Sequence, residues 1–214
     1  MTTDKIAVDA YKYFSSLEGN QHIASEFALK MILKIIAKHK PKAVLELGLG
    51  IGSISYSILS FSKMNNQEIV YYGTERNEFC LDALSKYLKE YYTKVKLYSS
   101  LSEVPTDIKF DLVIIDGSDE NIKKVENCIT KNGMIIIEGD RIPQLNILKT
   151  IFPKSFYTRV ISNYKNPNYG PFSSENYSGG LQLIFINPNL KQKIDFWKYK
   201  IYTSLNYKKR ALKK

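Results

Sequence analysis

The stretch Val44-Leu45-Glu46-Leu47-Gly48-Leu49-Gly50-Ile51-Gly52-Ser53 joins an apolar run to three glycines at alternate positions. Glycine has no Cβ, so it lets the backbone turn sharply and approach a ligand closely. A segment of helical periodicity follows, with Ile54, Ile58 and Phe61 on one face. The stretch therefore predicts a buried strand over 43–47, a tight turn, and a helix whose first free N–H groups face a polar ligand.

Outward from this turn, short apolar runs alternate with helical patterns. Further strands are expected at 68–73, 95–98, 111–115 and 133–137, and the helix after 111–115 is expected to run through Ile122, Val125 and Ile129. Strands that alternate with helices are joined by parallel crossovers, so we predict a doubly wound, Rossmann-like α/β sheet.

Two more expected strands, at 156–162 and 181–186, have no helix between them. Such strands pair antiparallel. The sheet should therefore have seven strands, mostly parallel, with the last one antiparallel.

The two ends of the chain are expected to be helical. We interpret residues 1–214 as a single domain with N-terminal helices in 1–40, a Rossmann-like core in 41–188 and a basic helical tail in 189–214. Apolar residues at helical spacing give that tail one apolar side, formed by Ile194, Trp197 and Ile201.

The sequence also bears on cellular location. No secretory signal is recognisable, and no apolar run reaches membrane-spanning length, so no membrane partner is expected. Cys80 and Cys128 lack a CxxC spacing and are interpreted as reduced core thiols of a cytoplasmic protein.

The net charge of +10 raises the question of nucleic-acid binding. However, only four of the 31 basic residues are arginines. Lysine is a point charge and lacks the bidentate hydrogen bonding by which arginine binds phosphates and base edges. Nucleic acid therefore stays a less favoured partner than a small molecule.

The glycine spacing bears on the class of ligand. A dinucleotide site of the form G-x-G-x-x-G would need a glycine where this chain has Ser53. The chain instead has an acidic residue, Glu46, followed by G-x-G-x-G. A carboxylate there suits the α-amino group of a sulfonium cofactor; a turn without any ligand is the alternative.

Two further acidic residues stand where predicted strands end. Glu75 comes about one βα unit after the glycines and could accept hydrogen bonds from a ribose diol. The alternative is that its negative charge only stabilises the first turn of the helix that follows. Asp116 ends the apolar run 110–115 at the same crevice, with a helix N-cap as its alternative role.

Together these motifs resemble the class I S-adenosylmethionine-dependent methyltransferases over about residues 21–186. The resemblance implies that the glycine turn and Glu46 surround the methionine end, that Glu75 holds the ribose, and that Asp116 lies near the methionine or the transferred methyl group. The residues that it places at the cofactor are Glu46, Leu47, Gly48, Gly50, Gly52, Ser53, Glu75, Arg76, Ser100, Leu101, Asp116 and Gly117, with Ser100 and Leu101 near the adenine.

Within that class, the chain looks most like the catechol-type O-methyltransferases. These bind a divalent metal through an Asp after strand four and an Asp-Asn pair after strand five. Asp116 matches the first position, whereas Glu138-Gly139-Asp140-Arg141 departs from the second. Asp116, Glu138 and Asp140 could still ligate Mg²⁺; alternatively, Glu138 is a general base, or Asp140 is the ion partner of Arg141.

The acceptor side of the site is less defined. The candidate general bases are Asp116, Glu138 and His22, and the candidate acceptor contacts are Asp140, Tyr169 and Tyr177. The loop over residues 163–180 is expected above the active site, either as a mobile lid or as an exposed loop without a role.

The leading hypothesis is a methyltransferase that acts on a small molecule, with oxygen as the expected acceptor atom and homodimerisation left open. The alternatives are an RNA methyltransferase that uses the basic tail, an NAD(P)-binding oxidoreductase and a non-catalytic binder of S-adenosylmethionine.

Overall fold

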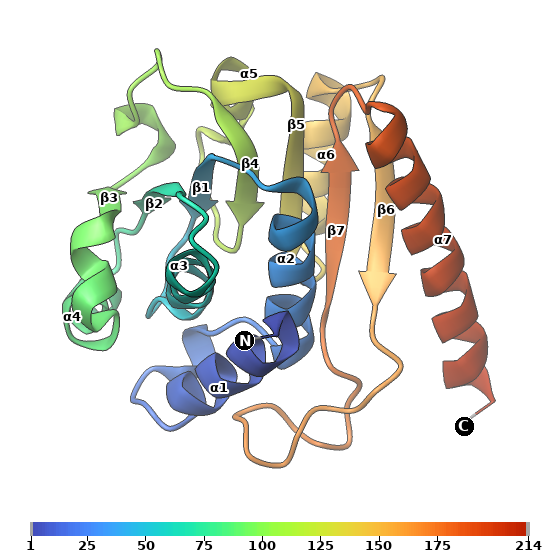
Figure 1. The fold of residues 1–214 in the computed structure, drawn as a ribbon, viewed down its shortest axis with the longest axis horizontal. Coiled ribbons are helices and arrows are strands. Elements are labelled where there is room, and N and C mark those ends of the chain that lie inside the picture. The colour runs from blue at the N-terminus through green and yellow to red at the C-terminus, as the bar shows by residue number, and fades with distance from the viewer. Residues whose placement is uncertain (1, 213–214) are drawn as a thin grey trace.

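The apolar runs of the sequence form one seven-stranded sheet in a computed structural model that describes residues 2–212 (Figure 1). Its order is β3-β2-β1-β4-β5-β7-β6. The strands are β1 (Ala43–Leu47), β2 (Val70–Thr74), β3 (Val95–Tyr98), β4 (Phe110–Ile115), β5 (Ile129–Glu138), β6 (Phe156–Ile161) and β7 (Gly180–Phe185). The helices of four residues or more are α1 (Thr3–Ser15), α2 (Glu26–His39), α3 (Ser53–Met64), α4 (Glu78–Tyr87), α5 (Val125–Cys128), α6 (Ile142–Ile151) and α7 (Leu190–Ala211).

The strand directions confirm the predicted fold. Neighbouring strands from β3 to β5 pair in parallel, and β7 is antiparallel to both β5 and β6. Because β1, β2, β4 and β5 are parallel, their carboxyl ends meet at one edge of the sheet. In this fold that edge is where ligands bind.

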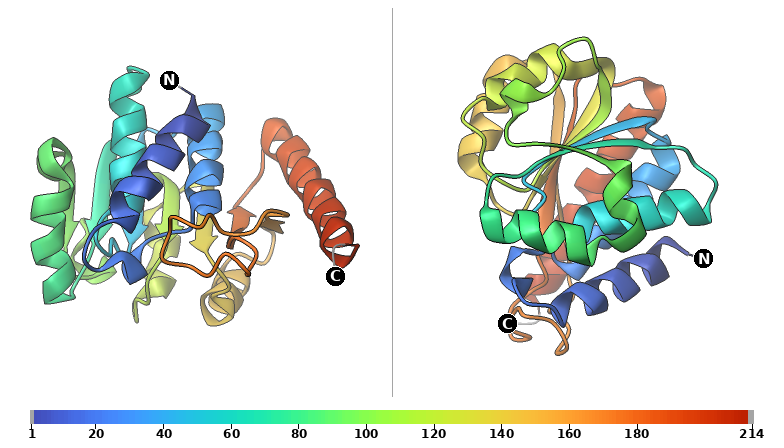
Figure 2. Two further views of the ribbon diagram at one scale, coloured as in Figure 1. Left: turned by 90° about the horizontal axis from the view of Figure 1, so that it is seen from below. Right: turned by 90° about the vertical axis from the view of Figure 1, so that its left-hand side faces the viewer.

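Helices cover both faces of the sheet (Figures 1 and 2). Successive side chains of a strand point to opposite faces. Val44 accordingly belongs to the core cluster that contains residues of α1, α2 and α3, while Leu45 belongs to the cluster that contains residues of α5 and α6. Burial on both faces explains why β4 and the second half of β5 are almost wholly apolar. The predicted helices ahead of the first strand are α1 and α2, and they lie on the same face as α3.

The predicted helix through Ile129 is wrong in extent. The structure has a 3-10 turn (Ile122–Lys124) and the short α5, and β5 already begins at Ile129. Ile129 pairs with Phe110 of β4 and is buried. Pairing with β4 gives its backbone hydrogen-bond partners within the sheet, which outweighs a weak helical periodicity.

The predicted tail helix, α7, covers an open edge of the sheet. Within the described part of the chain, strand β6 pairs only with β7, so its outer carbonyl groups need other donors. The Thr203 hydroxyl donates to the carbonyl of Arg159 at 2.6 Å, and the Asn206 side-chain amide donates to the carbonyl of Ile161 at 2.8 Å. Polar side chains of α7 therefore satisfy the edge of β6.

A buried acidic residue fixes the other end of α7. Asp195 is 1% exposed and contacts Lys38 and His39 of α2, with 2.9 Å between its Oδ2 and His39 Nε2. Burial lowers the pKa of His39, while the negative charge of Asp195 acts in the opposite direction. The inner face of α7 is thus largely polar, and the predicted apolar side with Trp197 faces outward.

Within residues 2–212, none of the helices has the length and apolar character required to traverse a lipid bilayer. Cys80 and Cys128 are buried and unbonded to each other, as predicted.

Replacing Asn206 by Ala should lower the free energy of unfolding by about 1–3 kcal/mol, because the buried carbonyl of Ile161 loses its donor. Urea denaturation measures this difference. Ser204→Ala, an exposed position on the same helix, is the control and should change stability by less than about 0.5 kcal/mol. Equal effects of the two substitutions would contradict the role of α7 in covering β6.

Candidate active site

A cavity of about 830 Å³ lies at the carboxyl ends of the parallel strands. This volume is within the usual range for small-molecule sites. Each of four neighbouring strands contributes residues from its end. They include Gly48 and Gly50 after β1, Thr74 and Glu75 at β2, Asp116 after β4, and Glu138 at the end of β5.

The turn after β1 packs backbone against backbone. Gly48 has φ +87°, and a Cβ there would lie 2.7 Å from the backbone of Gly117. Gly50 has φ +53°, and its Cβ would lie 2.6 Å from the carbonyl oxygen of His22. Since no other residue fits at either position, the predicted tight turn is confirmed.

Glu75 joins this turn to the start of α4. Its carboxylate accepts hydrogen bonds from the backbone N–H groups of Gly50, Arg76 and Asn77, each at 2.8 Å. The ends of β1 and β2 are therefore adjacent, as predicted, and Glu75 lies at the cavity between them.

Three ionisable side chains, those of Asp116, Glu138 and Arg141, meet at the far wall of the cavity. Arg141 Nη2 donates to Asp116 Oδ1 at 2.7 Å and also to the carbonyl oxygen of Asp116. Burial raises the pKa of Asp116 to about 6, against the effect of Arg141. Burial, together with the charge of Asp116, raises the pKa of Glu138 to about 8. At neutral pH Glu138 therefore holds a proton, while Asp116 is ionised beside Arg141.

The loop between β6 and β7 forms one side of the cavity through Asn166, Phe172 and Tyr177, among others. The loop is bonded to itself: the backbone N–H of Asn166 donates to the carbonyl of Asn176 at 2.9 Å, and its side-chain amide donates to the carbonyl of Ser173 at 3.0 Å. The predicted position of the loop above the site agrees with the structure, whereas its role as a mobile lid stays a prediction.

The loop also contacts the N-terminal helices. The Tyr169 hydroxyl donates to Glu26, and its ring meets Tyr11 edge-on at 6.1 Å between centroids. Tyr169 therefore anchors the loop to α1 and α2 outside the cavity, whereas Tyr177 lines it.

The structure brings most of the predicted site residues to this one cavity. Those that line it are His22, Gly48, Gly50, Glu75, Arg76, Ser100, Asp116, Gly117, Glu138 and Tyr177. Those outside its lining are Glu46, Leu47, Gly52, Ser53, Leu101, Asp140 and Tyr169.

Several of the residues outside the lining are buried beside the glycine turn after β1. Glu46 is fully buried in β1, and its carboxyl group accepts a hydrogen bond from Tyr71. Burial raises the pKa of Glu46 well above its ordinary value, against the effect of the hydrogen bond from Tyr71. Ser53 Oγ accepts a hydrogen bond from the N–H of Ala24 at 3.1 Å. The role of Glu46 at a methionine end stays a prediction.

The segment after β5 does not form the ion pair proposed from sequence. Asp140 pairs with Arg159 at 2.6 Å instead of with Arg141, which turns to Asp116. Among residues 2–212, no group of three or more His, Cys, Asp or Glu side chains is placed to hold a metal ion. The predicted set of Asp116, Glu138 and Asp140 therefore does not fit Mg²⁺, because a guanidinium already stands against Asp116.

Sequence reasoning missed several residues of the cavity wall. Asp119 lies in the lining and joins the ends of β3 and β4, because it accepts hydrogen bonds from the N–H groups of Leu101 and Asn121 at 2.8 and 2.7 Å. Ser25 N-caps α2, and a Cβ on Gly179 would lie 2.9 Å from its hydroxyl. The capping pattern at Ser25 was visible in the sequence, whereas its proximity to Gly179 was not.

No family model matches this sequence, and the comparison with curated proteins found no match either. Solved structures do match. The fold is similar to that of the O-methyltransferase TomG from Streptomyces achromogenes, involved in tomaymycin synthesis and crystallised with S-adenosylmethionine (11% identity, 86% of this chain and 91% of that one, TM-score 0.61). An O-methyltransferase from Bacillus cereus in complex with S-adenosylhomocysteine is also similar (12% identity, 86% and 92% covered, TM-score 0.59). So is the methyltransferase PaMTH1 from Podospora anserina, bound to S-adenosylhomocysteine (14% identity, 85% and 87% covered, TM-score 0.54).

The chain therefore has the Rossmann-like fold of the class I S-adenosylmethionine-dependent methyltransferases.

Replacing Arg141 by Met should raise the pKa of Asp116 by about one unit or more, because the guanidinium favours its ionised form. Carboxyl ¹³C NMR titration measures this pKa. Arg76→Met, at an exposed arginine that lines the same cavity, is the matched control. An Asp116 pKa equally affected by both substitutions would contradict a specific ion pair.

Proposed function

We propose that the protein is an S-adenosylmethionine-dependent methyltransferase that methylates a hydroxyl group of a small molecule by in-line displacement. The observation that carries this proposal is the juxtaposition in one cavity of the glycine turn, Glu75 and the Asp116–Glu138 pair. The similar O-methyltransferase structures bound to S-adenosylmethionine or S-adenosylhomocysteine support it.

The residues around the turn fit the cofactor. The space beside Gly48 and Gly50 and the start of α3 would take the methionine end, and Ser100 would lie on the adenine side. Glu75 would hold the ribose. A carboxylate has about four acceptor positions, and the backbone uses three of them, so one remains for a ribose hydroxyl. When bound, the cofactor supplies an electrophilic methyl group.

Glu138 is the general base in this proposal. A base is useful when the acceptor is a hydroxyl, whose proton must leave, and its best pKa lies near the working pH. A pKa of about 8 meets that condition. Asp116 keeps its negative charge beside Glu138, and the Arg141 guanidinium partly offsets that charge, so Glu138 can still ionise.

We also propose that the reaction needs no divalent cation. In the catechol-type group that the sequence resembles, a metal stands beside the Asp after strand four. Here the Arg141 guanidinium occupies that side of Asp116, and Asp140 is directed to Arg159. Arg141 would thus supply the positive charge next to the acceptor oxygen.

The cytoplasm is the compartment we propose, on the basis of the two free cysteines. A homodimer stays a prediction. The oxidoreductase and RNA alternatives are not favoured: Ser53 is buried where a dinucleotide turn needs its third glycine, and the arginine of α7, Arg210, is engaged with the carbonyl of Ser162.

Calorimetry with S-adenosylhomocysteine tests the cofactor assignment. The wild-type protein should bind this compound and should not bind NAD(P)H. Glu75→Ala should weaken the binding about tenfold or more, because the ribose loses a charged acceptor. Glu78→Ala, an exposed acidic position in the first turn of α4, is the matched control and should bind like the wild type. Unchanged affinity in Glu75→Ala would remove Glu75 from the site.

The pH dependence of methyl transfer tests the base. With an acceptor found in a panel of hydroxylated aromatic and sugar compounds, kcat/KM should rise with pH around a midpoint near 8, because Glu138 must lose its proton to act. Glu138→Gln should abolish this rise and lower kcat/KM about 10²–10⁴-fold.

Asp140→Asn is the control for that experiment, and a chelator is its companion. Asp140→Asn should keep the wild-type kcat/KM and its pH dependence, since Asp140 lies outside the cavity lining. EDTA should leave the kcat/KM of the wild-type protein unchanged, since the proposed reaction needs no divalent cation. A rate that falls with EDTA and returns with Mg²⁺ would refute the role given to Arg141.

A further inference from the structure

The outward face of α7 carries a row of exposed apolar side chains. We define the outer stripe as Leu190, Ile194, Trp197, Ile201 and Leu205, whose exposed fractions are 75, 47, 53, 58 and 50%. Their spacing of three and four residues puts them on one side of the helix. Isolated exposed apolar residues are ordinary, but a contiguous row marks an interaction surface.

The outer stripe lies opposite the face that holds α7 on the sheet, and the ring of Trp197 meets that of Phe196 of the same helix at 5.2 Å between centroids. The helix is attached by its opposite face, through the hydrogen bonds of Thr203 and Asn206 and the buried contacts of Asp195. Among residues 2–212, the five apolar side chains are therefore left about half exposed or more.

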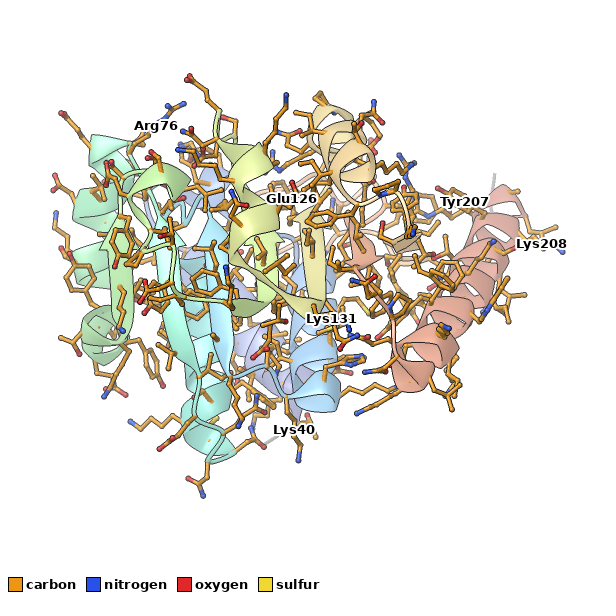
Figure 3. All side chains as sticks on the ribbon, turned by 90° about the horizontal axis from the view of Figure 1, so that it is seen from above. Lys40, Arg76, Glu126, Lys131, Tyr207 and Lys208 are labelled. Atoms are coloured by element: carbon orange, nitrogen blue, oxygen red, sulfur yellow. The ribbon has the colours of Figure 1, made fainter. Side chains whose placement is uncertain are left out.

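Lysines border the outer stripe on both sides. At 3.6 residues per turn, Lys198 flanks one side, while Lys193 and Lys200 flank the other. Lys191 precedes Lys198 on its side and donates to the carbonyl of Lys38 at 2.6 Å. Lys208 continues the line beyond Leu205 and projects away from the sheet (Figure 3). The acidic residue of α7, Asp195, is buried on the inner face. The outward face is thus an apolar strip bordered only by positive charge.

The apolar stripe and its flanking lysines together indicate which kind of partner could bind this face. A second copy of α7 would bring lysine against lysine, which is unfavourable. A nucleic acid would engage the lysines but leave the leucine and isoleucine side chains in water. An anionic lipid surface satisfies both features: the apolar side chains enter the boundary of the acyl chains, and the lysines extend to the head groups.

We propose that α7 docks flat on an anionic lipid surface through the outer stripe. The helix ends beside the cavity, because Arg210 donates to the carbonyl of Ser162 at 2.7 Å and its guanidinium lies 4.2 Å from the ring centroid of Tyr177. These contacts lie on the face of α7 opposite the outer stripe, so docking leaves the cavity open to the solution. This proposal does not rest on methyl transfer, so each can fail alone.

Vesicle binding tests the proposal, with Trp197 as the probe, since it is the single tryptophan of the chain. The full chain should sediment with vesicles of equal phosphatidylglycerol and phosphatidylcholine, and the emission of Trp197 should shift to the blue. It should not do so with phosphatidylcholine alone, and the binding should weaken at about 1 M salt.

Ile194→Ser combined with Ile201→Ser should reduce partitioning about tenfold or more. Met64→Ser combined with Val70→Ser removes two apolar side chains of similar exposure elsewhere and should bind like the wild type. Failure to bind the anionic vesicles overturns the proposal. So does a concentration-dependent dimer that the Ile194/Ile201 variant abolishes, or RNA binding that depends on the lysines but not on the two isoleucines.

Discussion

The site depends on a close approach between two backbone turns, one after β1 and one after β4. Gly48 and Gly117 meet so closely that a Cβ on Gly48 would lie 2.7 Å from the backbone of Gly117. The same contact lets the N–H of Asp116 donate to the carbonyl of Leu47 at 2.9 Å. The end of β4 is thereby drawn against the glycine turn, and the side chain of Asp116 emerges at the cavity that the turn borders. A side chain at either glycine would separate the two halves of the site.

That approach places several carboxyl groups in surroundings poor in water, and each is accommodated differently. Glu46 is fully buried and paired with Tyr71, and burial raises its pKa. Asp116 remains ionised because Arg141 is beside it. Glu138 lies between these cases. It is partly buried next to a negative charge, so its pKa is raised into the range where proton transfer is useful. The differences in partner, not in residue type, therefore distinguish the surroundings of these three carboxyl groups.

The sequence predicted the elements whose apolar pattern is set by burial, and it predicted the turn that only glycine can form. It did not predict which of several possible partners a residue pairs with in the folded chain. Ile129 entered β5 because β4 offers it hydrogen-bond partners, and Arg141 turned to Asp116 because Arg159, eighteen residues further on, takes Asp140. Local patterns carry no information on such distant partners. For the same reason, the hypothesis of a metal set at Asp116, Glu138 and Asp140, which came from the resemblance to catechol-type enzymes, could not foresee the two arginine partners.

The tail shows the limit of periodicity most clearly. The spacing of Ile194, Trp197 and Ile201 defines one apolar side of a helix, but it does not say whether that side faces the protein. Strand β6 decides the question, because its unpaired carbonyl groups require donors that apolar side chains cannot supply. Once Thr203 and Asn206 meet that requirement, the apolar side must face away from the sheet. Covering the sheet edge and presenting an apolar surface are thus two consequences of one helix orientation.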